Sequence, residues 1–482
     1  MAFHKNWLLL LSIAYFATLA YTESPGLLIE LFRHGARAPE SLIFDADHYW
    51  ANGPGQLTPV GMRMHYVLGA AMRQKYPELL SKYDPEKVYV RSSDVDRTIM
   101  SAYAHMQGIF QQTGPEMSES IDLSELGVKN TQDRNALPGR AQAVPIYSLP
   151  LVEDHSLKGY HLCARQAEWR LQNLQDSQTS EIFNKDMAEL VQHLSENNVQ
   201  VGDYALLGRV AEITLSNKFE NIKLPAGIAP ESQFFKDLKF VYEFYYTKTV
   251  EALPIQRALY AKPLLVSILE YIDDFLADRT PRNAIFLSAH DTTLMTLLAA
   301  FNITNTECLL ENYRNEKAGR SINYPDCVYP QYASNMIFEV YKAPEPSLAL
   351  FYDGKPINIC GKKSNRCSVK DFINYATQVT DSLNIEDYLG QCDPLHFENQ
   401  TTIQKGKQSR SRVILQTLKG FTNLEVKLMI ASVVLSLLIV CHWFVSQRNE
   451  NANEKIRPED IESVPSSDNE IVVNVAQAAQ ES

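Results

Sequence analysis

Six residues that could bind or attack a phosphate group follow three apolar runs in this sequence. Arginine guanidiniums pair bidentately with phosphate oxygens and stay charged at every relevant pH. A neutral histidine among them could attack phosphorus and form a phosphohistidine intermediate. Asp291 could protonate the leaving oxygen and afterwards take a proton from the attacking water. The six residues are Arg33, His34, Arg37, Arg91, His290 and Asp291.

This set of residues predicts phosphoryl transfer without a metal ion or another cofactor. The arginines and His290 would supply the charge stabilisation that magnesium gives in other phosphoryl-transfer enzymes. Two histidines and one aspartate among three arginines would also repel a cation, which argues against a metal site. The formal net charge of −12 gives no general attraction for nucleic acid, so we expect no nucleic-acid partner.

The three apolar runs share one design, in which a strand-like stretch leads into polar residues and then into a helix-like stretch. In open α/β sheets, ligands bind outside the carboxyl ends of the strands. We therefore expect an α/β domain with a mostly parallel central sheet flanked by helices, in which the three strand ends form one site. The runs are LLIELFRHGAR (residues 27–37), KVYVRSSDVDRT (87–98) and AIFLSAHDTTLMTLLAA (284–300).

The middle of the chain has a different pattern. Residues 117–245 contain helical periodicities and few strand-like runs, which predicts a helical cap inserted into the domain. The domain as a whole is expected over residues 21–400, with its α/β core over about residues 25–116 and 246–400. NMIFEVYKA and LALFYDGKPI indicate an antiparallel pair near an edge of the sheet.

The two ends of the chain carry targeting patterns. Residues 1–20 have a weakly basic start, an apolar centre and small residues near a cleavage site, which indicates a signal peptide rather than a short buried helix. The uncharged run Leu428–Val445 indicates one transmembrane helix over residues 427–445 rather than a buried core helix. We expect a stalk over residues 401–426 and an acidic cytoplasmic tail over residues 446–482.

The compartment follows from the signal peptide and the cysteines. More lysines and arginines precede the apolar run than follow it, which opposes the positive-inside rule, but an exported domain normally keeps its side of the membrane. The catalytic domain is then lumenal or extracellular in a single-pass type I membrane protein. An even number of cysteines, with no zinc-site spacing, predicts three disulfides there and leaves their connectivity open. These cysteines are Cys163, Cys308, Cys327, Cys360, Cys367 and Cys392. N-x-[ST] sequons at Asn302 and Asn399 agree with this compartment.

Three sequence blocks resemble the signature blocks of the histidine acid phosphatases, the R-H-G-x-R-x-P branch of the histidine phosphatase superfamily. They are RHGARAP (residues 33–39), VRSSDVDRT (90–98) and SAHDTT (288–293). The resemblance covers about residues 27–395. It includes LPLVEDHSLKGYHLC (149–163), which is similar to the segment that leads into the cap in the prostatic and lysosomal members.

The resemblance implies a role for each of the six residues. His34 would be the nucleophile and Asp291 the proton donor. It also implies an α/β core with a helical cap, frequent homodimerisation and a disulfide between Cys163 and Cys392. The ligands of the phosphate would be Arg33, Arg37, Arg91 and His290. Closeness in the sequence adds Cys360–Cys367, and elimination leaves Cys308–Cys327.

The function predicted from these features is that of an acid phosphatase, which hydrolyses phosphate monoesters through a phosphohistidine. One alternative is a phytase or inositol-polyphosphate phosphatase, which shares the first and third blocks but usually needs additional basic residues for its polyanionic substrate. Another is a non-catalytic membrane receptor on a phosphatase scaffold, against which the presence of all six residues argues. The expected location is the lysosome or the cell surface.

Overall fold

A computed structural model describes residues 24–41, 50–124, 133–163, 165–360 and 365–380, together with Cys392. The predicted signal peptide, stalk, membrane span and tail all lie outside these residues. Within the described ranges, every helix is too short or too polar to cross a membrane.

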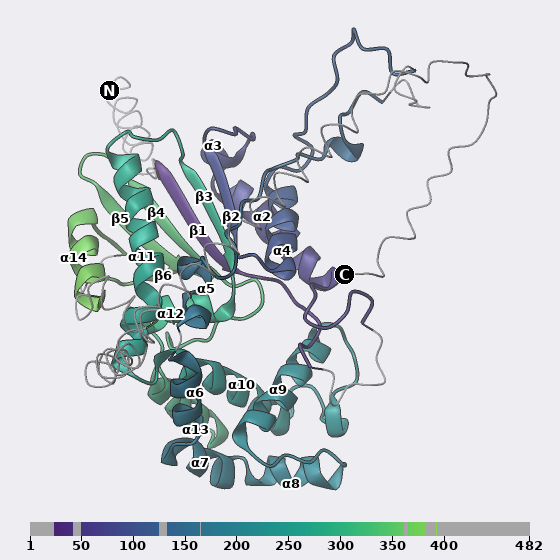
Figure 1. Cartoon of the computed structure of the whole chain (residues 1–482), viewed down its shortest axis with the longest axis vertical. Helices are drawn as coiled ribbons and strands as arrows, with labels where there is room; N and C mark the ends of the chain where they lie inside the picture. The colour runs from purple at the N-terminus through teal and green to yellow at the C-terminus, as the bar shows by residue number, and fades with distance from the viewer. Residues whose placement is uncertain are drawn as a thin grey trace, which may run out of the picture. The chain divides into compact units, whose positions relative to one another are not determined.

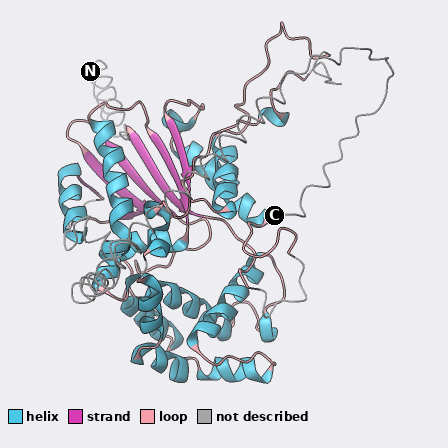
Figure 2. Cartoon of the chain, in the orientation of Figure 1, coloured by secondary structure: helices cyan, strands magenta, loops and turns pink. Residues whose placement is uncertain are grey.

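The central sheet is mixed, with a parallel half and an antiparallel half (Figures 1 and 2). Strand β3 lies between β2 and β1 and runs parallel to both. Beyond β1, strands β4 and β5 alternate in direction, and β6 and β7 both pair antiparallel with β5. The strands are β1 (Leu27–Arg33), β2 (Val88–Ser92), β3 (Ala284–Ala289), β4 (Asn335–Tyr341), β5 (Ser347–Tyr352), β6 (Lys355–Ile357) and β7 (Arg366–Ser368).

This topology corrects the expectation of a mostly parallel sheet. The segment between β4 and β5 has only five residues, 342–346, whereas a parallel crossover needs a dozen or more. The two strands were expected to be an antiparallel pair, and they are. They also lie near an edge, because only the short strands β6 and β7 follow β5, while β4 pairs with β1 on its other side.

Helices cover both faces of the sheet, so β1 is buried along its whole length and is apolar almost throughout. Leu28 and Phe32 pack against α2 and α4, while Leu27, Ile29 and Leu31 belong to the larger core that includes α11 and α12. The helices on the first face are α2 (Pro59–Lys75), α3 (Pro77–Leu80) and α4 (Asp96–Ile109). Those on the other face are α11 (Pro254–Leu276), α12 (Asp291–Ala300) and α14 (Val369–Thr380).

Most of the remaining helices lie together beyond one end of the sheet (Figure 1). Helix α10 is their centre, since it packs against α6, α9 and α13 and also against α12 of the core. In the described part of residues 117–245 there is no strand, as a helical insertion requires. These helices are α6 (Gln166–Leu174), α7 (Ser177–Glu181), α8 (Ala188–Glu196), α9 (Tyr204–Phe219), α10 (Gln233–Glu251) and α13 (Thr306–Lys317), with short helical turns at Ile182–Asp186 and Pro225–Gly227. Helix α5 (His155–Leu162) packs instead against α11 and β3 of the core, and a further helical turn lies at Pro138–Arg140.

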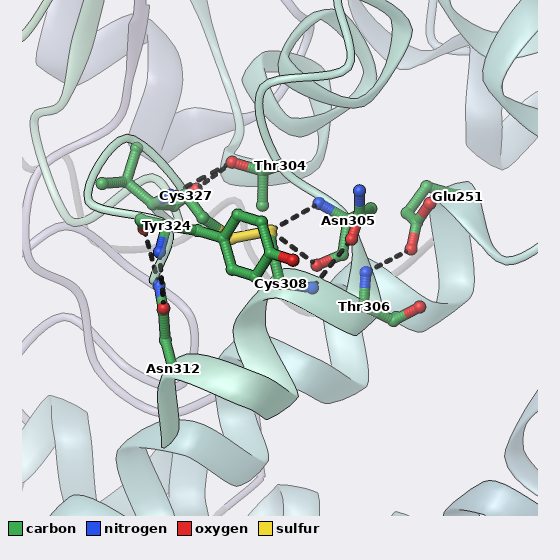
Figure 3. Close-up of a disulfide and its surroundings, with 9 residues drawn as sticks. Glu251, Thr304, Asn305, Thr306, Cys308, Asn312, Tyr324 and Cys327 are labelled. Atoms are coloured by element: carbon green, nitrogen blue, oxygen red, sulfur yellow. Dashed lines mark hydrogen bonds between the residues drawn. A yellow bond between two sulfur atoms is a disulfide. The ribbon is translucent and has the colours of Figure 1, made fainter. Parts of the chain in front are cut away.

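Three disulfides join the cysteine pairs that the resemblance, closeness in the sequence and elimination predicted. They are Cys163–Cys392, Cys308–Cys327 and Cys360–Cys367. Figure 3 shows the second, which ties the start of α13 to the loop that follows that helix. The Asn305 side chain caps the helix by accepting a hydrogen bond from the Cys308 amide at 2.8 Å. The Thr306 amide donates to Glu251 at 2.6 Å, which joins α13 to the end of α10.

Candidate active site

The carboxyl ends of β1 and β3 bring His34 and His290 together. The two strands are parallel and in register up to Arg33 and Ala289, and the His34 amide donates to the Ala289 carbonyl at 3.0 Å. The two imidazole rings lie edge to face with centroids 5.5 Å apart. Each histidine is only 2% exposed. The ends of two strands that are distant in the sequence therefore lie side by side, as the sequence pattern predicts.

His34 is held as a neutral imidazole with a defined orientation. Its Nδ1 lies 2.8 Å from the Gly35 carbonyl oxygen, which can only accept, so Nδ1 carries the proton. Its Nε2 therefore has the free electron pair, and it accepts a hydrogen bond from Nε of Arg97 at 3.1 Å. Burial, and then the positive charges of Arg97, Arg33 and Arg37, hold the pKa of His34 well below its usual value.

Gly35 is required because α2 starts directly against the chain after β1. A Cβ atom at Gly35 would lie 2.3 Å from the Gly61 carbonyl oxygen. The close approach is fixed from the helix side too, because the Thr58 side chain caps α2 and also donates to the Ala36 carbonyl at 3.1 Å. The glycine in the first block thus keeps the loop with His34 tight against the N-terminus of α2.

Asp291 forms a buried ion pair with Arg33 at the first turn of α12. The Arg33 Nη2 atom lies 2.9 Å from Asp291 Oδ2, and the Tyr242 hydroxyl donates to the same oxygen at 2.9 Å. Arg33 is held further by the Pro330 carbonyl at 2.7 Å and by stacking of its guanidinium on Tyr332 at 4.2 Å. Burial opposes ionisation of Asp291, but the charges of Arg33 and Arg37 outweigh it and hold its pKa below the usual value.

Arg37 is tied to the helical cap. Its Nη1 atom lies 2.7 Å from Glu212 Oε1 of α9. The same carboxylate oxygen accepts from the Glu40 backbone amide at 2.9 Å. Burial alone would lower the pKa of Arg37, but the nearby Tyr332 and Glu212 outweigh burial and raise the pKa. The guanidinium therefore stays charged. The cap therefore positions one of the guanidiniums of the core.

The structure places Arg91 away from His34. The Arg91 guanidinium pairs with the buried carboxylate of Asp154, and its Nη1 donates to the Ser156 hydroxyl at 2.8 Å. Asp154 also caps α5, accepting from the Leu157 amide at 3.0 Å. Arg91 therefore fixes α5 on the sheet, and the structure does not bring it to the other five residues.

Arg97 provides the third guanidinium at His34. It lies in the first turn of α4, which follows β2, and it belongs to the same sequence block as Arg91. Arg91 is paired in register with Leu287, short of the strand end where His290 follows β3. The signal that could have identified Arg97 is its position in a helix that starts just beyond a strand end, where side chains face the ligand region. The set of guanidiniums around His34 is thus Arg33, Arg37 and Arg97.

A second group of polar residues surrounds His290. Its Nε2 lies 2.9 Å from the Ser93 hydroxyl, which in turn lies 2.9 Å from the Thr98 hydroxyl. Burial, then the charges of Lys158 and Arg97, hold the pKa of His290 well below its usual value. The pKa of Lys158, which is buried on α5, is lowered to about 8 by burial and by Arg97. At acidic pH the site therefore has a neutral His290 beside a charged lysine.

Within the described residues, no group of three histidine, cysteine, aspartate or glutamate side chains is arranged to hold a metal ion. The polar groups around His34 and His290 are instead three guanidiniums and one ammonium, with the carboxylates of Asp291, Glu212 and Glu40 paired to the guanidiniums. Such a set favours binding of a tetrahedral oxyanion, because guanidinium forks match its oxygens and remain charged. The cap residues Tyr242 and Glu212 were not identified from the sequence, since no motif marks them.

Comparisons with known proteins agree with this chemistry. Residues 40–369 match the family model described as "Histidine phosphatase superfamily (branch 2)". Lysosomal acid phosphatase of Bos taurus is 27% identical over 381 residues, which cover 75% of this chain and 78% of that protein. Prostatic acid phosphatase of Homo sapiens is 27% identical over 287 residues, covering 57% and 68%. Among solved structures, the phytase of Klebsiella sp ASR1 has a similar fold, with a TM-score of 0.51 at 15% identity, covering 76% of this chain and 97% of that one.

Proposed function

This chain belongs to the histidine phosphatase superfamily (branch 2), and we propose that it is an acid phosphatase that hydrolyses phosphate monoesters through a phosphohistidine at His34. One observation carries the proposal. A buried neutral imidazole directs its unprotonated Nε2 toward a guanidinium, with two further guanidiniums close enough to lower its pKa. An oxyanion bound by these arginines would place its central atom in front of Nε2.

Substrate binding exchanges contacts within the site. Arg97 donates to His34, and Arg33 pairs with Asp291. Phosphate oxygens would take the place of these partners on both guanidiniums, which frees Nε2 to attack and reduces the positive charge that keeps Asp291 ionised. Arg37 is already oriented by Glu212 and would complete the set of phosphate ligands.

In the first step, the electron pair of His34 Nε2 forms a bond to phosphorus and the ester P–O bond breaks. The leaving oxygen needs a proton, which Asp291 would donate. The pKa of Asp291 lies below its usual value in the absence of substrate, so protonation requires acid, or a substrate that arrives as the monoanion. Both requirements favour low pH. The hydrogen bond from Nδ1–H to Gly35 stabilises the positive charge that develops on the ring.

In the second step, Asp291 would take a proton from water, whose oxygen attacks phosphorus on the side from which the alcohol left. The P–N bond breaks, and inorganic phosphate leaves. His290, held by Ser93, would lie beside the transferring group as a neutral hydrogen-bonding partner. His34 returns to the neutral form that its environment favours.

A polyphosphate-specific enzyme is a less suitable function for this chain. The likeness to phytase structures, at 15% identity, is one of fold, whereas the sequence relatives reported above are acid phosphatases. Two carboxylates, Glu40 and Glu212, also lie on the guanidiniums of the site. A pocket for a polyanion would need more basic groups at these positions.

The proposed location is a lumenal or extracellular compartment, with one membrane span over residues 427–445 and the tail in the cytosol. Support comes from the signal-peptide pattern, the three disulfides and the lysosomal acid phosphatase relatives. Protease added to sealed vesicles should remove only the tail. Degradation of the catalytic domain would show that the orientation is inverted. Homodimerisation, which the resemblance implies, is tested by the mass of the detergent-solubilised protein in light scattering.

The proposed activity is tested with the full-length protein in detergent. It should release phosphate from p-nitrophenyl phosphate and glycerol 2-phosphate, faster at about pH 5 than at about pH 7.5, and should keep this activity in the presence of EDTA. Complete loss of activity on chelation, or a rate that rises steadily to neutral pH, would contradict the mechanism.

A further inference from the structure

The carboxylate of Glu40 covers the solvent side of two guanidiniums in the site. Its Oε1 lies 3.1 Å from Arg97 Nη2 and 3.8 Å from Arg37 Nη2. The Glu40 side chain is 50% exposed, whereas the Arg37 and Arg97 side chains are 4% and 15% exposed. The negative charge therefore lies at the more exposed side of these two guanidiniums.

The position of Glu40 is fixed from two directions. From the cap, Glu212 of α9 accepts the Glu40 amide at 2.9 Å. From the core, the Gly55 amide donates to the Pro39 carbonyl at 2.9 Å, and a Cβ atom at Gly55 would lie 3.6 Å from the Glu40 side chain. Gly55 has φ of +70°, a conformation that favours glycine. The backbone beneath Glu40 is held, so its carboxylate stays near the guanidiniums.

Arg97 links Glu40 to the nucleophile. Its Nε contacts His34 while its Nη2 contacts Glu40, so one guanidinium separates the attacking nitrogen from this carboxylate. The Arg97 guanidinium would therefore lie between a phosphate on His34 and the negative charge of Glu40. The scissile phosphate itself is compensated by three arginines, but a second anionic group beside Arg97 and Arg37 would lie close to the Glu40 carboxylate.

We propose that Glu40 is a specificity-determining residue that selects phosphate monoesters with neutral or cationic leaving groups and disfavours those with a second anionic group near the scissile phosphate. The inference rests on the proposed function, because it concerns the substrate class of that same site. Like charges placed side by side weaken binding strongly, and more so when partly removed from water. Lys158 on α5 would have the opposite effect to Glu40, because its positive charge would attract a second anion. The structure places the carboxylate, not the ammonium, directly on Arg97 and Arg37.

The kinetic test compares wild type with Glu40→Gln, which keeps an oxygen that can accept from Arg97. The substrates are glycerol 2-phosphate, which has a neutral leaving group, and 2-phosphoglycerate and phytate, which add negative charge. At about pH 6, the ratio of kcat/KM for the neutral over the anionic substrates should fall about tenfold in Glu40→Gln. The change should lie mainly in KM for the anionic substrates.

The matched control is Glu86→Gln. Glu86 is exposed and precedes β2, at the opposite end of the strand from the site, so it changes the net charge equally without changing the site. The control should leave the ratio as in wild type. Equal changes in both variants would mean that total charge decides, and an equal loss for all substrates in Glu40→Gln would mean that Glu40 only holds Arg97. Either result overturns the proposal.

A binding measurement separates this inference from the proposed activity. Calorimetry gives the Kd of each protein for methylenediphosphonate and for inorganic phosphate. The affinity for methylenediphosphonate, divided by the affinity for phosphate, should be about tenfold higher in Glu40→Gln than in wild type. If wild type hydrolyses no monoester but this shift appears, the proposed function is wrong, whereas the inference that Glu40 disfavours a second anionic group is supported. If hydrolysis occurs but both the kinetic ratio and the binding ratio are unchanged, Glu40 is not the selecting residue.

Discussion

Nε of Arg97 lies 3.1 Å from Nε2 of His34, the ring nitrogen that carries the free electron pair. The other ring nitrogen is committed to the Gly35 carbonyl at 2.8 Å. The guanidinium therefore lies at the nucleophilic atom itself. A phosphate bound to Arg97 would be brought to the position from which phosphorus can be attacked.

We expect Arg97→Met and Arg97→Lys each to lower kcat/KM by about 10²- to 10³-fold, the loss typical of one preorganised donor to a transition-state oxyanion. The ammonium of Arg97→Lys cannot form the bidentate fork. Steady-state kinetics on p-nitrophenyl phosphate measure the loss, and thermal unfolding shows whether the fold is retained.

Arg91→Met is the comparison, because it removes a guanidinium from the same sequence block. It should mainly lower stability, by about 3–5 kcal/mol, since Asp154 is left buried without its ionic partner. The folded fraction should lose far less activity than Arg97→Met. If Arg91→Met had the larger loss of kcat/KM per folded molecule, the assignment of the third guanidinium to Arg97 would be wrong.

Asp291→Asn should affect esters according to their leaving groups. Alkyl phosphates such as glycerol 2-phosphate release a basic alkoxide that needs a proton, so kcat/KM should fall by about 10²- to 10⁴-fold. p-Nitrophenyl phosphate, whose leaving group departs readily as an anion, should lose much less. Equal losses for both esters would show that Asp291 acts only as the ionic partner of Arg33.

Stability should fall as the pH decreases below about 6.5. His34, His65 and His290 all have pKa values held well below the usual one, chiefly by burial, so they stay neutral when folded. In the unfolded chain they take up protons below about pH 6.5, which favours unfolding by up to about 1.4 kcal/mol per pH unit for each group. Above that pH the folded and unfolded forms are both neutral, and the effect is absent.

Denaturant unfolding between about pH 7.5 and pH 5 measures this slope. His65→Gln is a suitable variant, because His65 lies on α2 and binds the Arg33 carbonyl at 3.0 Å, away from the substrate. It should reduce the slope by the contribution of one group. A free energy of unfolding that increases steadily toward acid would contradict the neutral state of these histidines.

The sequence was sufficient to predict that His34 and His290 lie close together, because strand ends followed by polar residues indicate the carboxyl edge of a sheet. His34 and His290 meet there as the register of β1 and β3 requires. This pattern could not show which of Arg91 and Arg97 faces the site. Which arginine faces the site depends on where β2 ends and on the buried partner Asp154, which lies far along the chain.

The residues that the helical cap contributes to the site could not be predicted from the sequence, for a related reason. Tyr242 and Glu212 reach the site through the packing of α9 and α10, and both helices have apolar patterns that specify burial but not which polar side chain turns toward the core. The direction of β4 and β5 was readable from the short connection between them, but the pairing of β4 with β1 was not. That pairing is a long-range contact that no local pattern encodes.

The most direct test of the central claim is rapid quenching of the enzyme with ³²P-labelled substrate, followed by measurement of protein-bound label. Wild type should show a phosphoenzyme that is labile in acid and stable in base, as a phosphohistidine is, and His34→Ala should show none with any ester. If His34→Ala still accumulates an acid-labile, base-stable phosphoenzyme, the nucleophile is another histidine, with His290 the nearest candidate, and the roles assigned to the ends of β1 and β3 are contradicted.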